Sequence, residues 1–154
     1  MALLLKTVVN KIPIHRDNRN SPGIDIRIAI GIGNIDAKRE TVNESSGDAY
    51  TYSGRTLDSM KKNKRLLAIK TNKPELDAEL ETEFKLLEVI MSGWKVTSAE
   101  VLYLTLFGKS EKQIAEQLKV SQSAINQRKK TAGWSGIEPL LKRFEELIDK
   151  EENK

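Results

Sequence analysis

The sequence predicts an α+β fold, in which a helix–strand–helix–strand region is followed by an all-helical region with a helix-turn-helix. Three observations support this prediction. Isoleucine occupies every second position from 24 to 32, as expected of a strand with one buried, wholly isoleucine face. An acidic helix is predicted to begin at Pro74. Residues 110–132 have the pattern of two short helices joined by a tight turn.

The composition excludes several kinds of site. The chain has no cysteine, so it forms no disulfides and no thiolate metal sites. His15 is the single histidine, so one chain has no multi-histidine metal site. The longest apolar runs, 2–5 and 101–107, are too short to span a bilayer. We therefore expect a cytoplasmic protein without a cofactor and without a membrane partner.

Charge is distributed unevenly along the chain. The net charge is +4, but residues 1–74 hold 14 basic and 7 acidic side chains. Residues 75–94 hold 1 basic and 6 acidic side chains, and residues 95–134 hold 7 and 3. A basic footprint over the predicted helix-turn-helix is expected of a nucleic-acid binder.

The N-terminal region is predicted to contain two helices and two strands. In the first helix, over residues 1–11, the apolar spacing of Leu4, Leu5, Val8 and Val9 predicts a docked face. Residues 15–22 form a polar loop. A second helix over 48–63 and a strand over 65–70 follow the isoleucine strand.

Two glycines at positions 31 and 33 permit either a phosphate or a packed backbone to approach the strand. A phosphate cradle needs a third glycine and a helix directly behind the loop, but position 36 is Asp and no helix is predicted there. Close packing of a helix on the strand is the favoured interpretation.

Two capping signals define the helix-turn-helix. Ser110 and Gln113 form a capping box for the first helix, and Ser121 is an N-cap for the second. Val120 fills the bend between them, above the small residue Ala115. The apolar stripe continues through both helices at Ile114, Leu118, Ala124, Ile125 and Ala132. The alternative is a helical hairpin whose charges form a solvated face.

If the second helix enters a major groove, side chains near its start are candidates to contact base edges. These are Gln122, Ser123, Asn126 and Gln127. Basic side chains around them are candidates to contact phosphates, which fix the register without specifying sequence. These are Lys109, Lys112, Arg128, Lys129 and Lys130.

The flanking helices also have sequence signals. Thr97 with Glu100 is predicted to cap the helix before the motif, and Ser135 with Glu138 the helix after it. Gly133 suits a left-handed helix end. Trp94 and Trp134 are interpreted as core anchors. The apolar stripe of the last helix either completes the core or contacts a second subunit, and it comprises Ile137, Leu140, Leu141, Phe144, Leu147 and Ile148.

The motif at residues 110–132 resembles the helix-turn-helix of sigma-factor region 4 and of response-regulator effector domains. The matching residues are Ile114, Ala115, Leu118, Ser121, Ile125 and Arg128. Two residues depart from that pattern. Lys119 replaces the usual glycine, so either a left-handed turn there would cost about 1 kcal/mol or the turn differs from the usual one. Lys129 replaces a usual apolar residue, so its stem must cover the core.

Residues 27–35 and 46–57 resemble the last part of a nucleotide-cyclase-like domain, and specifically the SatD family, which joins such a domain to a C-terminal helix-turn-helix. The resemblance implies a partial ferredoxin-like, cyclase-like fragment whose first half is absent. It implies no defined activity. The metal-binding acidic residues of such domains would lie in the absent half. The aspartates in the fragment form no pair suited to two magnesium ions, so we do not expect the chain to be an enzyme; these aspartates are Asp25, Asp36, Asp48 and Asp58.

The predicted organisation is a cyclase-like fragment over 1–72, an acidic connector helix over 73–94 and a helix-turn-helix domain over 95–154. The expected function is transcription regulation through double-stranded DNA, by a homodimer that forms across the N-terminal sheet or by exchanged elements. The effector, if it is a small molecule, is not identified by the sequence. Two alternatives stay open: a nucleotide-binding or cyclase-like protein completed by another chain, and a protein-interaction adaptor.

Overall fold

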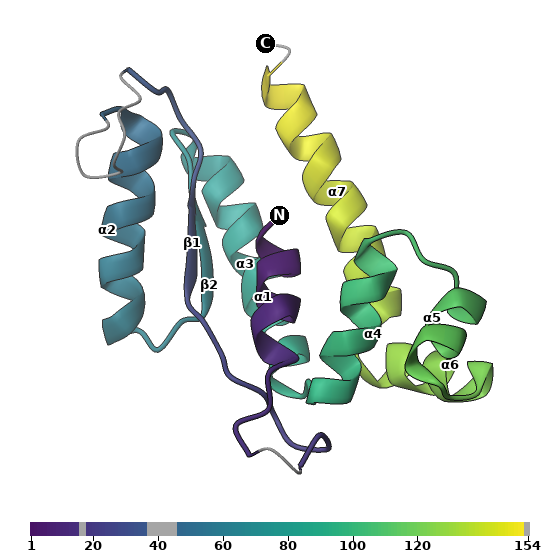
Figure 1. Cartoon of the computed structure of the whole chain (residues 1–154). Helices are drawn as coiled ribbons and strands as arrows, with labels where there is room; N and C mark the ends of the chain where they lie inside the picture. The colour runs from purple at the N-terminus through teal and green to yellow at the C-terminus, as the bar shows by residue number, and fades with distance from the viewer. Residues whose placement is uncertain (16–17, 37–45, 153–154) are drawn as a thin grey trace. The chain divides into compact units, whose positions relative to one another are not determined.

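The computed structural model describes residues 1–15, 18–36 and 46–152. Over these residues, seven helices and a two-stranded sheet follow in the order α1, β1, α2, β2 and α3 to α7 (Figure 1). The described structure is therefore mixed and mostly helical, which is consistent with the predicted α+β class.

Contacts divide the chain into two compact units. One comprises residues 26–89, and the other comprises residues 3–25 together with 90–154. In this division residues 3–25 belong with the C-terminal helices, whereas the boundaries predicted from the sequence lie at 72 and 94. The domain boundaries themselves stay a prediction.

The sheet in the unit of residues 26–89 is a parallel pair. β1 (Ile28–Gly31) lies beside β2 (Leu67–Lys70), with Ile28 opposite Leu67, and α2 (Asp48–Lys62) connects them. The predicted order of strand, helix and strand is confirmed. β1 is shorter than predicted, because the Ile24 N–H donates to the Ile12 carbonyl, 2.9 Å away. Ile24 is 43% exposed and Ile28 is half-buried, so the prediction of a wholly buried isoleucine face was wrong.

The direct pairing of β1 with β2 also differs from a ferredoxin-like half. In that fold the strand–helix–strand unit is split, with another strand between its two strands. Here the two strands are hydrogen-bonded neighbours, as shown by the Ile28 N–H, which donates to the Leu66 carbonyl at 2.9 Å. The α-β-α-β order agrees with the expected fragment, whereas the strand order does not.

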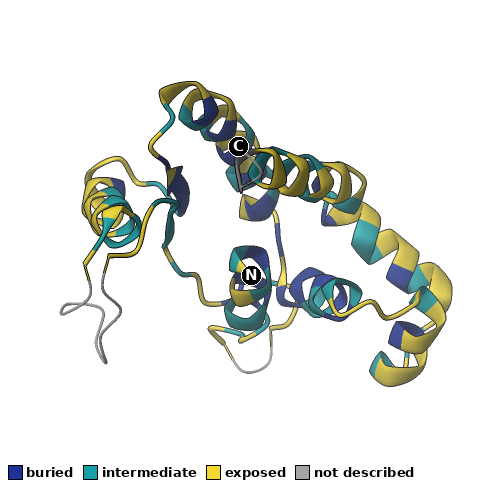
Figure 2. Ribbon diagram, turned by 90° about the horizontal axis from the view of Figure 1, so that it is seen from above, coloured by how far each residue is buried: buried dark blue, intermediate teal, exposed yellow. Residues whose placement is uncertain are grey.

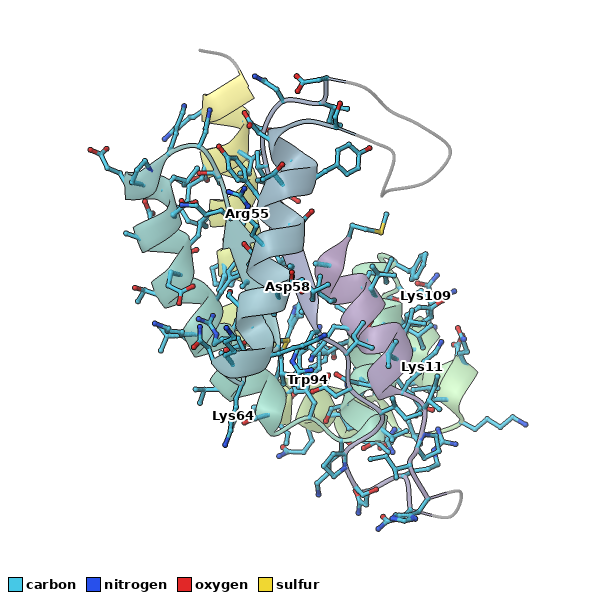
Figure 3. All side chains as sticks on the ribbon, turned by 90° about the vertical axis from the view of Figure 1, so that its left-hand side faces the viewer. Lys11, Arg55, Asp58, Lys64, Trp94 and Lys109 are labelled. Atoms are coloured by element: carbon cyan, nitrogen blue, oxygen red, sulfur yellow. The ribbon has the colours of Figure 1, made fainter. Side chains whose placement is uncertain are left out.

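Glycine in and after β1 allows α2 to approach the strand closely. A Cβ at Gly31 would lie 2.1 Å from the Ala49 carbonyl oxygen, and one at Gly33 would lie 2.7 Å from the Asp48 Cβ. The interpretation of these glycines as a packing site is therefore confirmed. Arg55 and Asp58 lie on the opposite, exposed side of α2 (Figure 3).

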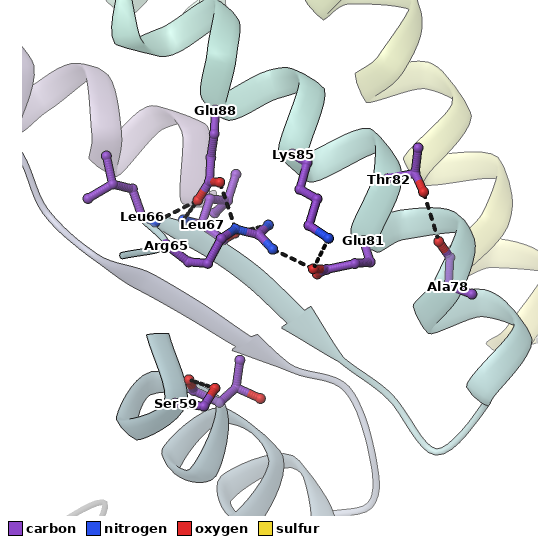
Figure 4. A network of polar contacts seen from close by, with 10 residues as sticks. Ser59, Arg65, Leu66, Leu67, Ala78, Glu81, Thr82, Lys85 and Glu88 are labelled. Atoms are coloured by element: carbon purple, nitrogen blue, oxygen red, sulfur yellow. Dashed lines mark hydrogen bonds and ion pairs between the residues drawn. The ribbon is translucent and has the colours of Figure 1, made fainter. Parts of the chain in front are cut away.

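An acidic helix closes part of the outer edge of β2. Two carboxylates of α3 (Pro74–Ser92) accept backbone N–H groups at the ends of this strand. Glu88 Oε1 accepts from Leu67 N at 2.6 Å, and Asp77 Oδ1 accepts from Thr71 N at 2.7 Å. Arg65 pairs with Glu88, with its Nε 2.7 Å from Oε2 (Figure 4). The predicted start at Pro74 is confirmed. The buried apolar side chains of α3 (Figure 2) are those of Leu76, Leu80, Phe84, Leu87 and Met91.

The ion pairs of α3 make stability depend on pH. Burial raises the pKa of Glu81, but Lys85 and Arg65 lower it by more, so this pKa lies below its ordinary value. A lowered pKa in the folded state means that the stabilisation is present above the unfolded-state pKa of 4.5 and is lost as pH falls through the folded-state pKa.

We therefore expect Glu81→Gln to flatten the fall in stability below pH 4.5, by at most about 1 kcal/mol because the side chain is partly exposed. Urea unfolding between pH 7 and pH 3 measures this effect. Glu75→Gln, at an exposed position in the same helix, is the control. Parallel pH profiles for wild type and Glu81→Gln would contradict the assignment.

The buried face of the first helix is not the face that the sequence predicted. α1 spans Ala2–Asn10, and its buried side chains are not the predicted Leu4, Leu5, Val8 and Val9 but Leu3, Lys6, Thr7 and Asn10. Polar partners explain the difference. The segment after the first loop returns to α1, where Lys6 pairs with Asp25 and the Asn10 amide donates to the Ile24 carbonyl at 2.7 Å.

The two caps that the sequence predicted for the helices flanking the motif were wrong. α4 (Val96–Leu106) begins before Thr97, and Lys95 is its N-cap without a side-chain bond. The Val96 N–H donates instead to the Ser21 carbonyl at 3.1 Å, and Glu100 pairs with Arg19. The hydrogen bond and charge of Glu100 raise the Arg19 pKa.

The last helix, α7 (Trp134–Glu152), likewise begins before Ser135, directly after the left-handed residue Gly133. Among the helices in the described ranges, none combines the length and the hydrophobicity needed to cross a bilayer.

Candidate nucleic-acid interface

The first helix of the motif is fixed at its start by a reciprocal cap. α5 spans Glu111–Leu118. The Gln113 N–H donates to Ser110 Oγ at 3.3 Å, and the Ser110 N–H donates to Gln113 Oε1 at 2.9 Å. The predicted capping box is therefore confirmed, and it satisfies two backbone donors at the helix end.

A left-handed residue makes the turn. Lys119 has φ 55° and ψ 45°, and the following Val120 N–H donates to the Ala115 carbonyl at 3.1 Å. Lys119 therefore adopts the left-handed conformation although it is not a glycine. Val120 packs against the core of the motif, as predicted for the corner residue.

We expect Lys119→Gly to stabilise the protein by up to about 1 kcal/mol, because glycine adopts this conformation without a steric penalty. Chemical denaturation measures the change. Glu116→Gly, at an exposed position in the interior of α5, is the control and should destabilise by about 1 kcal/mol. A loss at position 119 equal to that at position 116 would show that the turn is unstrained.

The second helix of the motif is also capped. α6 spans Gln122–Thr131, and the Ala124 N–H donates to Ser121 Oγ at 3.2 Å, as predicted. Ile125 of α6 is fully buried in a cluster with α4 and α5, whose other members are Val101, Leu104, Ile114 and Ala115. A capped start and a buried anchor fix the rotation of α6 about its own axis.

That rotation exposes all the predicted base-contacting side chains. Gln122 and Asn126 are one helical turn apart, and Ser123 and Gln127 form a second such pair. All four are exposed. At 100° per residue, Lys130 lies on the same face, between the two rows. The face opposite Ile125 therefore combines amides, a hydroxyl and an ammonium group.

The predicted phosphate contacts differ in exposure. Lys109, Lys112 and Lys130 are exposed, whereas Arg128 is half-buried. Lys129 lies inside the motif instead, with its Nζ 3.2 Å from Glu111 Oε1 and 5.9 Å from the Trp134 ring centroid. The ion pair between Lys129 and Glu111 was not predicted from the sequence. The signal that could have indicated it is a lysine at a position that is usually apolar in such motifs.

Tryptophan joins the end of α6 to the preceding segment of the same unit. Trp94 is 3% exposed, and its Nε1 donates to the Ala132 carbonyl at 2.9 Å. Gly133 has φ 75°, and a Cβ there would lie 2.6 Å from Ile90 Cγ2. The prediction that Trp94 is a core anchor and that Gly133 is a left-handed helix end is confirmed.

The apolar stripe of α7 is only partly covered. Ile137 is fully buried, but the remaining residues of the stripe that the sequence predicted are half-buried. Both interpretations of this stripe, core or subunit contact, therefore stay open.

Acidic side chains do not gather into a metal site in the part of the chain that the structure describes. Asp25 binds Lys6 and Asn10, while Asp48 and Asp58 lie exposed on α2.

Comparisons of the whole chain with family models, curated proteins and solved structures found no match.

Proposed function

We propose that the chain is a DNA-binding transcription regulator whose α6 enters the major groove of double-stranded DNA. The observation that supports this most is the exposed face of α6, on which Gln122, Ser123, Asn126 and Gln127 surround Lys130. Amide side chains donate to and accept from the edge of adenine in the major groove, and an ammonium group binds phosphate or guanine.

The charge around α6 supports the same proposal. Residues 109–132 hold six basic and two acidic side chains. Glu111 is paired with Lys129, so a positive surface remains at the exposed lysines. Lys109, Lys112 and Lys130 contact phosphates in this proposal, and Arg128 contributes through its exposed part.

Titration of a labelled random duplex, followed by fluorescence anisotropy at several salt concentrations, tests the proposal. We expect log affinity to fall linearly with log salt. Lys130→Ala should weaken binding to every duplex and reduce that slope by about 1. Lys150→Ala, an exposed lysine near the end of α7, is the control and should leave the slope unchanged. Absence of binding at low salt would contradict the proposal.

The regulator acts as a homodimer in this proposal, with the N-terminal α-β-α-β region as its assembly or sensory module. A two-stranded sheet is marginal by itself, and a free strand edge favours addition of further strands. The carboxylates of Asp77 and Glu88 accept backbone donors along the outer edge of β2, so the proposal assigns the contact with a second copy to the outer edge of β1. Sedimentation should show a dimer at micromolar concentration, and a monomer there would exclude this assembly.

A further inference from the structure

Lys129 differs from the lysines that surround the exposed face of α6. Its side chain is 20% exposed, and that of its partner Glu111 is 25% exposed, whereas Lys130 beside it is exposed. A part-buried pair is screened less by salt than an exposed one. At salt concentrations at which an exposed lysine can bind a phosphate, Lys129 therefore stays paired with Glu111.

The contacts of Lys129 connect three helices. Its own backbone belongs to the last turn of α6, and Glu111 lies in the first turn of α5. Trp134, whose ring centroid lies 5.9 Å from the ammonium group, is the first residue of α7. An ammonium group within about 6 Å of an indole is attracted by the ring. One side chain thus restrains the end of α6 from two sides.

Chemistry at this position also argues against a phosphate contact. Moving the Lys129 ammonium onto DNA would break the bond to Glu111 and leave a carboxylate in the first turn of α5 without its partner. That carboxylate would repel the approaching phosphate. Lys130, one residue further on, can bind phosphate without any such loss.

We propose that Lys129 is a positioning residue, which holds α6 at its angle to α5 through Glu111 and does not bind phosphate. This inference rests on the proposed DNA-binding function. The pair of Glu111 and Lys129 then determines how well the side chains of α6 align with base edges, while the exposed lysines determine how DNA affinity depends on salt.

Matched substitutions at adjacent lysines separate the two roles. Lys130→Gln should reduce the salt slope for random duplex by about 1, and Lys129→Gln should leave it unchanged. For a preferred duplex obtained by selection, Lys129→Gln should lower the ratio of specific to random affinity about fivefold, because a displaced α6 misaligns its base contacts. Lys129→Arg keeps the charge and should restore the ratio.

Unfolding equilibria provide a second readout that needs no DNA. In a double-mutant cycle of Glu111→Gln and Lys129→Gln, we expect the two residues to be coupled by about fivefold in the unfolding constant. A reduced salt slope in Lys129→Gln would identify a phosphate contact and overturn the proposal, and so would coupling below about 1.5-fold. If the wild type binds no duplex, the proposed function fails by itself, and the cycle still decides whether the pair holds α6.

Discussion

Trp94→Ala should destabilise the unit that contains residues 90–154 by about 3–5 kcal/mol, because it removes a buried aromatic side chain and leaves a cavity. Trp94→Phe should cost less. It retains an aromatic ring but leaves the Ala132 carbonyl without the indole N–H, a loss of about 1–3 kcal/mol for a buried acceptor.

Urea unfolding followed by circular dichroism measures both changes. Phe107→Ala, at an aromatic side chain that is 57% exposed and forms an edge-on aromatic pair with the Tyr103 ring, is the matched control and should cost less than about 1.5 kcal/mol. Equal losses for Trp94→Ala and Phe107→Ala would mean that Trp94 does not anchor the end of α6.

Asn126→Ala should lower affinity for the preferred DNA site by about 1–3 kcal/mol while leaving binding to random duplex almost unchanged. The physical reason is that a single amide can bind both the donor and the acceptor of one adenine edge. Its neighbour on the same face, Lys130, has no such selectivity, so Lys130→Ala should weaken both duplexes similarly.

Competition titrations with a selected and a random duplex measure this division. Asn72→Ala, an exposed amide in the segment between β2 and α3, controls for removal of an amide elsewhere. If Asn126→Ala and Lys130→Ala reduce specific and random binding by equal factors, groove contacts by α6 are excluded as the basis of specificity.

Local signals in the sequence predicted the helix-turn-helix well, since its boundaries depend on neighbouring residues. Ser110 with Gln113, and Ser121 by itself, form the expected caps within three residues of chain. Ile125 is buried as its spacing predicted. Such features need no knowledge of distant partners.

Features that depend on distant partners were predicted poorly. The buried face of α1 includes Lys6 because Asp25, far along the sequence, binds it. Thr97 matches a capping pattern, but the Ser21 carbonyl satisfies the first amide of α4 and the helix starts earlier. The pair between Lys129 and Glu111, eighteen residues away, was not predicted either. Tertiary contacts of this kind leave no periodic signal in the sequence.

The most direct test of the account is to map the DNA-contacting surface residue by residue. Amide chemical shifts of the labelled full chain would be followed by NMR during titration with a preferred duplex. The account predicts the largest changes at residues 121–130, centred on the exposed face of α6, with smaller changes near Lys109 and Lys112. Absence of changes at α6, or changes confined to residues 26–89, would contradict it.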